Sequence, residues 1–257
     1  MITRRQFLTG SAGFFAALSG LSLFSKYDLI NNISNSIPIL LYHRVGLEGD
    51  PLTITTSRFQ KDIETLSQEG YTPLSLTQLK QHIKSPNEPL PSKPIIITFD
   101  DGYLDNYTNA FPILQKYSMK ASFEIITGMV GQNDRMTIPQ IREMEAAGMG
   151  FGAHTVTHRS LAELNRKDAA TELTKSKADL EQIIGKTVEF IAYPGGYYTA
   201  ETINLAREAG YIGGFSVNPG FAMFKDAMAI RRMPIFHYDR SISYVMLRKG
   251  LLPDMLS

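Results

Sequence analysis

The stretch IIITFDDG, residues 95–102, joins an apolar run to two adjacent carboxylates, Asp100 and Asp101. Its β-branched and aromatic residues predict a buried strand that ends at Phe99. Adjacent carboxylates repel each other, and a dry strand terminus would raise the pKa of one of them. A helix cap with Gly102 as the turn accounts for one aspartate, whereas a bound cation accounts for both. We therefore expect functional charge at the carboxyl end of this strand.

The rest of the chain repeats this pattern of a short apolar run followed by a segment of helical period, which is typical of βα units. A capping box at Ser57 and Gln60, and another at Thr137 and Gln140, predict two of the helix starts. The expected strands are 37–41, 95–99, 121–126, 149–153, 188–193, 211–217 and 229–236, and the expected helices are 57–70, 75–83, 106–117, 137–148, 167–184 and 199–209. About seven strands in a single domain predict an α/β barrel or an open parallel sheet, and periodicity alone does not choose between them. Both architectures place functional residues beyond the carboxyl ends of the strands.

Composition excludes several classes of function. The 257 residues carry 26 Lys plus Arg against 25 Asp plus Glu, so the chain lacks the basic surface that a nucleic-acid partner requires. There is no cysteine, which excludes disulfides, thiolate nucleophiles and cysteine-based zinc sites. A metal site in this chain would need histidine and carboxylate ligands.

The first thirty residues predict an export signal. Arg4 and Arg5 precede a mild apolar stretch from Phe7 to Phe24, and no acidic residue occurs before Asp28. This looks like a twin-arginine signal, and it fits an amphipathic first helix of the domain poorly. Ala17-Leu18-Ser19 is a weak cleavage site, so an uncleaved membrane anchor stays open. We expect residues 1–30 to form the signal or anchor, residues 31–257 to form the catalytic domain, and the protein to act in the periplasm or on the outer face of the membrane.

Four of the five histidines lie at or just past expected strand ends: His43, His154, His158 and His237. His154 and His158 are four residues apart, a spacing that lets two imidazoles converge on one ion. The spacing alone also occurs by chance and on ordinary surfaces. Two histidines and one carboxylate leave a coordination position open, and the second carboxylate is then free to act as a base.

Three motifs carry a resemblance to a known family: T98-F99-D100-D101-G102, H154-T155-V156-T157-H158 and A192-Y193-P194-G195-G196. In their order and spacing they resemble the three motifs of the polysaccharide deacetylases, the carbohydrate esterases of family four. The resemblance covers about residues 37 to 240. It implies a distorted (β/α) barrel and the metal-dependent removal of N- or O-acetyl groups from a sugar polymer.

The resemblance also implies roles for the motif residues. Asp101, His154 and His158 would hold a divalent metal, with zinc first and other divalent ions as alternatives, and Asp100 would be the general base. The turn Pro194-Gly195-Gly196, with Tyr193 before it, would contact the substrate and offer a backbone N–H to the oxyanion. Glycines there let the backbone approach a substrate closely.

The general acid and the partner of the base are less clearly marked. L40-L41-Y42-H43-R44-V45 resembles the opening motif of the subgroup that deacetylates poly-N-acetylglucosamine, which favours His43 as the acid; His237, in a loose match to another family motif, is the alternative. The third motif usually begins with an arginine that orients the base, but here the position is Ala192. Arg231 or Arg232 is expected to supply that guanidinium, or else the two form a surface charge pair.

We therefore expect a hydrolase that removes N-acetyl groups from an N-acetylglucosamine polysaccharide, with poly-N-acetylglucosamine favoured. Peptidoglycan, chitin oligomers and acetylated xylan are alternative substrates, and a degenerate member that only binds glycan is the alternative from another class. Several tyrosines are expected to stack on sugar rings or to pack within the domain: Tyr42, Tyr103, Tyr107, Tyr193, Tyr197 and Tyr198.

Overall fold

A curved parallel sheet organises the chain. The computed structural model describes residues 36–47, 49–222, 224, 226–251 and 253, and the chain from Ile37 onward forms one compact unit. The strands follow the order β10-β1-β5-β6-β7-β8-β9, and every neighbouring pair is parallel. Their bounds are β1 Ile39–Tyr42, β5 Pro94–Asp100, β6 Ser122–Ile125, β7 Gly150–Ala153, β8 Phe190–Ala192, β9 Gly213–Phe215 and β10 Met233–Pro234, and β4 Thr72–Pro73 pairs with the start of β5.

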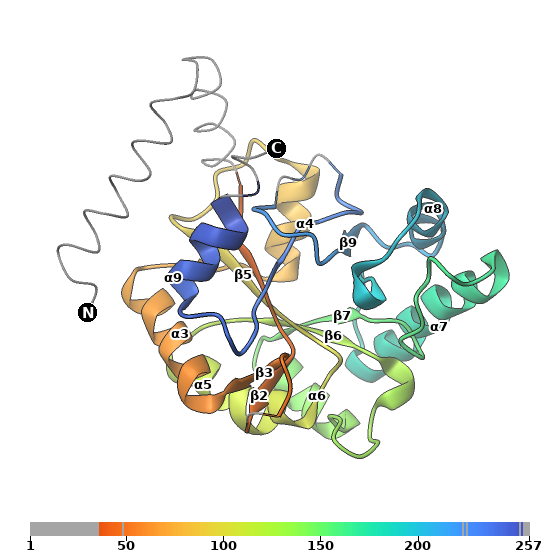
Figure 1. Cartoon of the computed structure of the whole chain (residues 1–257). Coiled ribbons are helices and arrows are strands. Elements are labelled where there is room, and N and C mark those ends of the chain that lie inside the picture. The colour runs from red at the N-terminus through yellow and green to blue at the C-terminus, as the bar shows by residue number, and fades with distance from the viewer. Residues whose placement is uncertain (1–35, 48, 223, 225, 252, 254–257) are drawn as a thin grey trace. The chain divides into compact units, whose positions relative to one another are not determined.

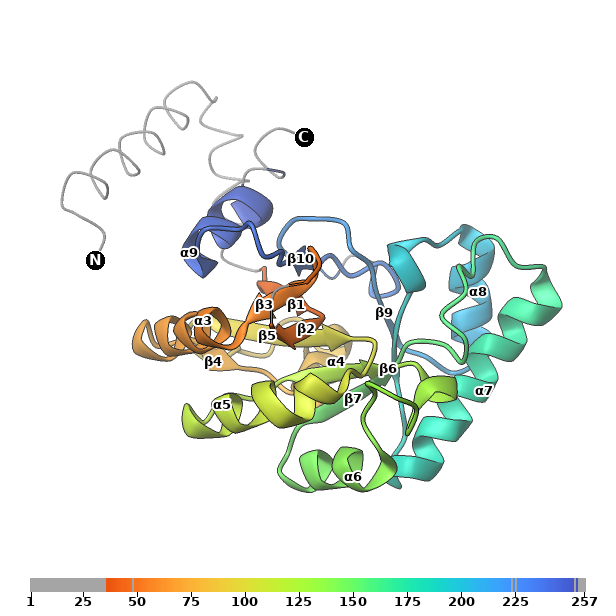
Figure 2. The same ribbon diagram turned by 60° about the horizontal axis from the view of Figure 1, so that its bottom comes forward.

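Helices follow one another around the outside of this sheet (Figure 1, Figure 2). They are α3 Thr56–Gln68, α4 Leu76–Lys84, α5 Phe111–Lys116, α6 Ile138–Ala146, α7 Arg166–Ile184, α8 Ala200–Glu208 and the short α9 Ile242–Val245. A π-helical turn, Asn106–Ala110, leads into α5, and a second, Met246–Leu251, follows α9. The expected distorted (β/α) barrel with about seven strands is confirmed.

Side chains on the central strands point alternately to the two faces of the sheet, with aromatic rings on one face and polar groups on the other. Tyr42, Phe99, Phe123 and Phe151 form a row of neighbouring rings across β1, β5, β6 and β7, with successive centroids 5.4, 4.9 and 5.8 Å apart. Phe59 of α3 packs on this row, which therefore faces the helices. Because side chains alternate along a strand, Thr98 and Asp100 face the opposite side, the interior of the barrel.

Near the carboxyl end of the sheet, the residues of β5, β6 and β7 that face the barrel interior are polar or small. Across β5, β6 and β7 the register places Asp100 beside Glu124 and Glu124 beside Gly152. One layer lower, Thr98 lies beside Ser122 and Ser122 beside Gly150. The interior face of β5, β6 and β7 is thus polar toward its carboxyl end.

Two details near the helix starts differ from the sequence expectations, and one agrees with them. Thr55, and not Ser57, caps α3, because Thr55 ends the strand β3 (Thr53–Thr55) in extended conformation and its side chain accepts from the Arg58 N–H. The pair β2 (Arg44–Gly46) and β3 was not expected, since three-residue strands are too short to show a period. The capping box of Thr137 and Gln140 is confirmed at the start of α6.

The expected strand 229–236 is wrong as a continuous element. Ile230 makes an isolated parallel bridge to Phe215 of β9, whereas Met233 and Pro234 pair with β1. The chain therefore leaves one edge of the barrel and joins the other within a few residues. Arg232 lies at this crossing, and its side chain is completely buried.

The expected signal or anchor, residues 1–30, lies outside the described residues. None of the helices in the described part of the chain combines the length and the hydrophobicity of a membrane-spanning segment.

Candidate active site

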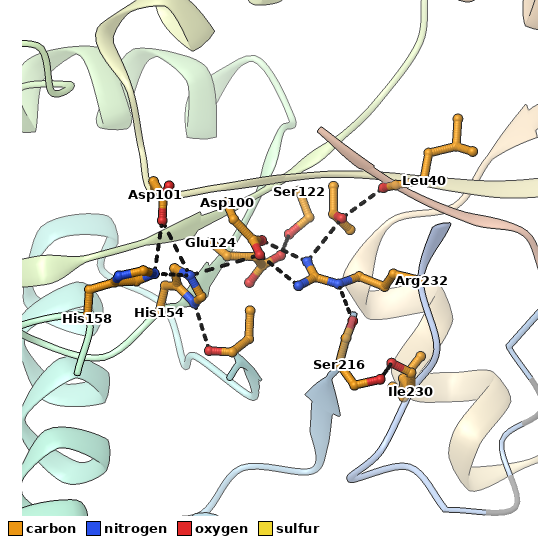
Figure 3. A network of polar contacts seen from close by, with 12 residues as sticks. Leu40, Asp100, Asp101, Ser122, Glu124, His154, His158, Ser216, Ile230 and Arg232 are labelled. Atoms are coloured by element: carbon orange, nitrogen blue, oxygen red, sulfur yellow. Dashed lines mark hydrogen bonds and ion pairs between the residues drawn. The ribbon is translucent and has the colours of Figure 1, made fainter. Parts of the chain in front are cut away.

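A buried ion pair between Asp100 and Arg232 lies at the centre of the site (Figure 3). The two terminal nitrogens of Arg232 donate to the two carboxylate oxygens of Asp100, each at 2.7 Å. Arg232 Nε donates to the Ser216 carbonyl at 2.9 Å, and Nη1 also donates to Thr98 Oγ1 at 3.2 Å. The fork geometry of arginine matches a carboxylate, so this pair fixes the orientation of Asp100.

The environment keeps Asp100 ionised. Burial alone raises the pKa of Asp100, but the charges of Arg232 and His154 and the hydrogen bonds from Arg232 outweigh burial, and the net pKa lies below its ordinary value. Of the two candidates Arg231 and Arg232, Arg232 is the one whose guanidinium the structure places on both oxygens of Asp100. A carboxylate held in this way is an oriented proton acceptor.

Asp101, His154 and His158 converge next to this pair. Asp101 Oδ1 lies 3.4 Å from Nε2 of each histidine, and the two Nε2 atoms are 3.2 Å apart. Within the described residues these three form the group of side chains that could hold a metal ion. Figure 3 shows both rings and the Asp101 carboxylate directed at one point.

The triangle fits a metal centre. Ligands 2.0–2.1 Å from a tetrahedral zinc ion are about 3.3–3.4 Å from one another, which matches the three separations. Asp101 Oδ1 is buried without a hydrogen-bond partner among the described residues, as an oxygen that accepts a metal would be. His154 Nδ1 lies 2.8 Å from the Ala192 carbonyl, so Nδ1 donates its hydrogen there and Nε2 is the ring nitrogen directed at the triangle. Burial raises the pKa of Asp101, but the hydrogen bond and charge of His154, together with the charges of His43 and His158, outweigh burial and hold the pKa well below its usual range.

The backbone that presents these ligands is unusual. Asp101, Thr155 and His158 have positive φ angles of 77°, 64° and 62°, a region that non-glycine residues rarely occupy. Gly102 also has a positive φ, 69°, and a Cβ there would lie 3.0 Å from the Ile125 side chain. Such strain concentrates at functional sites, where the surroundings hold it in place.

Glu124 is a buried residue beside the site that the sequence analysis missed. It is fully buried beside Asp100, its Oε1 accepts from Ser122 Oγ at 2.6 Å, and its Oε2 has no hydrogen-bond partner among the described residues. Burial, reinforced by the Asp100 charge, raises the pKa of Glu124 to about 8. Glu124 is therefore neutral at pH 7, unlike Asp100. A charged residue in the middle of the expected strand 121–126 was the available signal.

The two histidines considered as the general acid lie in different surroundings. Burial lowers the pKa of His43, and the carboxylates of Asp100 and Asp101 raise it in part, which places His43 within electrostatic reach of the site. His43 Nδ1 is buried and meets no hydrogen-bond partner in the described part of the chain. His237 is exposed; its backbone N–H donates to the Pro51 carbonyl, and its ring packs on Tyr238.

The turn after β8 is anchored next to His154, because it follows Ala192. Gly195 and Gly196 have positive φ angles of 64° and 75°, and the Gly196 N–H donates to the Tyr193 carbonyl at 2.8 Å. Pro194 is buried and has no N–H, so Gly195 is the member of this turn left to offer one. The Tyr193 side chain is fully buried and its hydroxyl donates to the Met228 carbonyl, which leaves it no surface for a sugar.

The remaining tyrosines divide between the core and the surface. Tyr42 is buried in the aromatic row and donates to Asp62, and the exposed hydroxyl of Tyr107 donates to Glu143. The Tyr103 ring lies between the guanidinium groups of Arg44 and Arg135, 4.4 and 3.8 Å from its centroid. Tyr198 packs on Tyr193, and Tyr197 is 66% exposed. Tyr197 is thus the ring most open to a ligand.

Comparison with known protein sequences agrees with this geometry. Residues 87–213 match the family model of the polysaccharide deacetylases. The chain is 33% identical to YxkH of Bacillus subtilis, whose name assigns it to the polysaccharide deacetylases, with 77% of this chain and 71% of that protein covered. It is 30% identical to a poly-β-1,6-N-acetyl-D-glucosamine N-deacetylase of Staphylococcus aureus, with 71% and 72% covered.

Solved structures show the same relationship. The deacetylase PplD of Streptococcus pyogenes, in complex with acetate, superposes with a TM-score of 0.78 at 29% identity and covers 83% of this chain and 98% of its own. IcaB from Ammonifex degensii superposes with a TM-score of 0.71 at 28% identity, with 78% and 91% covered.

Proposed function

Because the chain belongs to the polysaccharide deacetylase family, we propose that it removes N-acetyl groups from a poly-N-acetylglucosamine polysaccharide with the help of a divalent metal, zinc first. The observation that carries the proposal is the triangle of Asp101, His154 and His158 beside the ion pair of Asp100 and Arg232. A protein that only binds glycan needs no oriented, unprotonated carboxylate next to a set of metal ligands. The arrangement therefore supports hydrolysis.

Each residue of the site has a task in this reaction. A divalent ion held by Asp101, His154 and His158 would polarise the acetyl carbonyl and make water more acidic. Asp100 takes a proton from the attacking water, and Arg232 holds both of its oxygens so that the carboxylate cannot rotate away. The Gly195 N–H is the backbone donor proposed for the developing oxyanion.

The leaving amine needs a proton, and His43 is the proposed donor. An amide nitrogen leaves poorly unless it is protonated, so an acid must lie on the sugar side of the site. His43 experiences the charges of Asp100 and Asp101, whereas the His237 ring is exposed at the surface and packs on Tyr238. This difference favours His43.

The substrate assignment has two kinds of support. His43 stands in the opening motif that resembles the poly-N-acetylglucosamine subgroup, and the relative from Staphylococcus aureus is named for that substrate. The histidine and carboxylate donor set suits zinc among the divalent ions, although manganese, iron and cobalt accept similar ligands.

Acetate release tests the proposal. The protein is incubated with poly-β-1,6-N-acetylglucosamine, chitin oligomers, peptidoglycan and acetylated xylan. Each reaction is run untreated, with chelator, and with zinc added after the chelator. We expect acetate from the first polymer, its loss with chelator and its return with zinc. Full activity in chelator would contradict the metal mechanism. Acetate from another polymer alone would change the substrate, and no acetate from any would leave only glycan binding.

We also propose that the enzyme is exported through the twin-arginine route, in line with the extracellular polymer that would be its substrate. A reporter fused after residue 30 should cross the membrane only while Arg4 and Arg5 are intact. Export of an R4K/R5K variant at the rate of the original would refute this route. Fractionation of the full chain would distinguish a cleaved signal from an anchor.

A further inference from the structure

The turn that carries the two histidine ligands is strained. Thr155 and His158 occupy the left-handed region at φ 64° and 62°, and a β-branched residue such as threonine is a pronounced outlier there. The His158 N–H donates to Thr155 Oγ1 at 3.0 Å, which ties the two strained residues together. Strained backbone of this kind persists only when neighbouring groups hold it.

A single buried carboxylate holds the N–H groups of this turn. Glu172 lies in the second turn of α7 and is 8% exposed. Its Oε2 accepts from the N–H groups of Val156 and Thr157 at 2.8 and 2.9 Å, and its Oε1 accepts from Thr157 Oγ1 at 2.6 Å. A carboxylate has the acceptor capacity for all three, and hydrogen bonds to a charged acceptor are the strong ones.

The carbonyl groups of the same turn are held from the other side. The N–H groups of Thr127 and Gly128, after β6, donate to the carbonyls of Thr155 and Val156, both at 3.0 Å. A Cβ on Gly128 would lie 2.5 Å from the Val156 carbonyl oxygen, so only glycine allows this approach. The turn is thus clamped between Glu172 on one side and the segment after β6 on the other.

We propose that Glu172 is a positioning residue of the metal centre: its three hydrogen bonds hold His154 and His158 at the separation that one ion requires. The proposal rests on the proposed function in that it takes the triangle of Asp101, His154 and His158 to be the metal site. Glu172 does not touch that triangle, and it acts through the backbone that connects the two histidines. Groups that orient metal ligands in this way strongly affect metal affinity.

Metal binding, rather than turnover, tests the proposal. Zinc affinity is measured by competition with a chromophoric chelator for the full chain and for E172A, E172Q and E181A. Glu181 is a matched control, because it lies on the same helix and accepts from a backbone N–H, that of Val188 at 2.9 Å, away from the turn. We expect E172A to lower zinc affinity about tenfold or more, E172Q to lower it less, and E181A to leave it unchanged.

Two further measurements separate positioning from a general loss of structure. Thermal unfolding in chelator shows whether each metal-free variant is folded, and E172Q keeps one oxygen for the two N–H groups should E172A fail to fold. The visible spectrum of bound cobalt reports ligand geometry, and it should change in E172A and in G128A but not in E181A.

Wild-type zinc affinity and an unchanged cobalt spectrum in folded E172A, or in E172Q if E172A does not fold, would overturn the inference. The proposed function fails differently: the full chain would then bind zinc with the expected dependence on Glu172 and still release no acetate. If the full chain itself bound neither zinc nor cobalt, the triangle would not be a metal site and the role of Glu172 would fall with it.

Discussion

Arg232 holds both carboxylate oxygens of Asp100 at 2.7 Å, although 132 positions separate the two residues along the chain. The pair is completely buried, and the remaining nitrogen of Arg232 is occupied by the Ser216 carbonyl. Asp100 therefore has one orientation, which is decided by a residue that is distant along the sequence and adjacent in the fold.

Removing the guanidinium should damage both stability and turnover. R232A leaves the Asp100 charge buried without its partner, which typically costs about 3–5 kcal/mol, and R232K keeps a charge that cannot hold two oxygens at once. We expect acetate release to fall about a hundredfold or more in both variants, because Asp100, the proposed base, is no longer oriented. Urea unfolding and steady-state kinetics measure the two effects. R166A, which deletes an exposed arginine with its own ion pairs, is the control and should leave both unchanged.

The adjacent aspartates should fail in different ways. D101N should lose bound zinc and activity together, because it alters a proposed ligand. D100N should retain zinc and lose about a hundredfold to ten-thousandfold in kcat, because it lacks a proton acceptor. Zinc content after dialysis, measured beside acetate release, distinguishes the two. Equal zinc loss in both variants would contradict the division of roles.

The general acid can be identified by the leaving group. H43A should lose most of its activity on an N-acetylated sugar, whose nitrogen needs a proton to leave, and much less on an aryl acetate, whose phenolate leaves without one. H237A should retain activity on both substrates. A selective loss with H237A instead would show that His237 is the acid.

Glu124 should make the protein less stable as the pH rises. Its pKa is raised from an ordinary value of 4.5 to about 8, so between these values the folded chain holds a proton that the unfolded chain has released. The contribution of Glu124 to the free energy of unfolding is then fully present below about pH 4.5. It is lost as the pH rises toward 8, by at most about 1.4 kcal/mol per pH unit. E124Q mimics the neutral acid and should flatten that fall. Urea unfolding in chelator from pH 5 to 9 tests this, and parallel curves for the two proteins would contradict it.

Gly152 should not tolerate a side chain, because the Glu124 carboxyl group occupies the space beside it. A Cβ there would lie 1.8 Å from Glu124 Oε2, so G152A should cost about 1–3 kcal/mol of unfolding free energy through overpacking. Removing the conflicting carboxylate in the double variant E124A/G152A should recover part of that loss, and the two effects should not add. Strict additivity in a double-mutant cycle would show that the two positions do not compete for space.

The sequence could predict the residues at strand ends because parallel strands bring their carboxyl ends to one edge. This places Asp100, Asp101, His154 and His158 together from local patterns alone. Local patterns could not decide between Arg231 and Arg232 as the partner of Asp100. That choice depends on where the chain stops pairing with β9 and begins to pair with β1. Glu172 escaped notice because a glutamate in a long polar helix looks like a solvated residue until the turn that it binds is seen.

The break in the last strand also determines when, during synthesis of the chain, Asp100 can meet Arg232. Arg232 immediately precedes β10, and β10 completes the sheet by pairing with β1, the first strand of the domain. A ribosome has therefore translated all the other strands of the sheet before Asp100 gains its partner. A chain truncated before this point would contain all three proposed metal ligands, but Asp100, the proposed base, would lack its partner, so incomplete products should be inert.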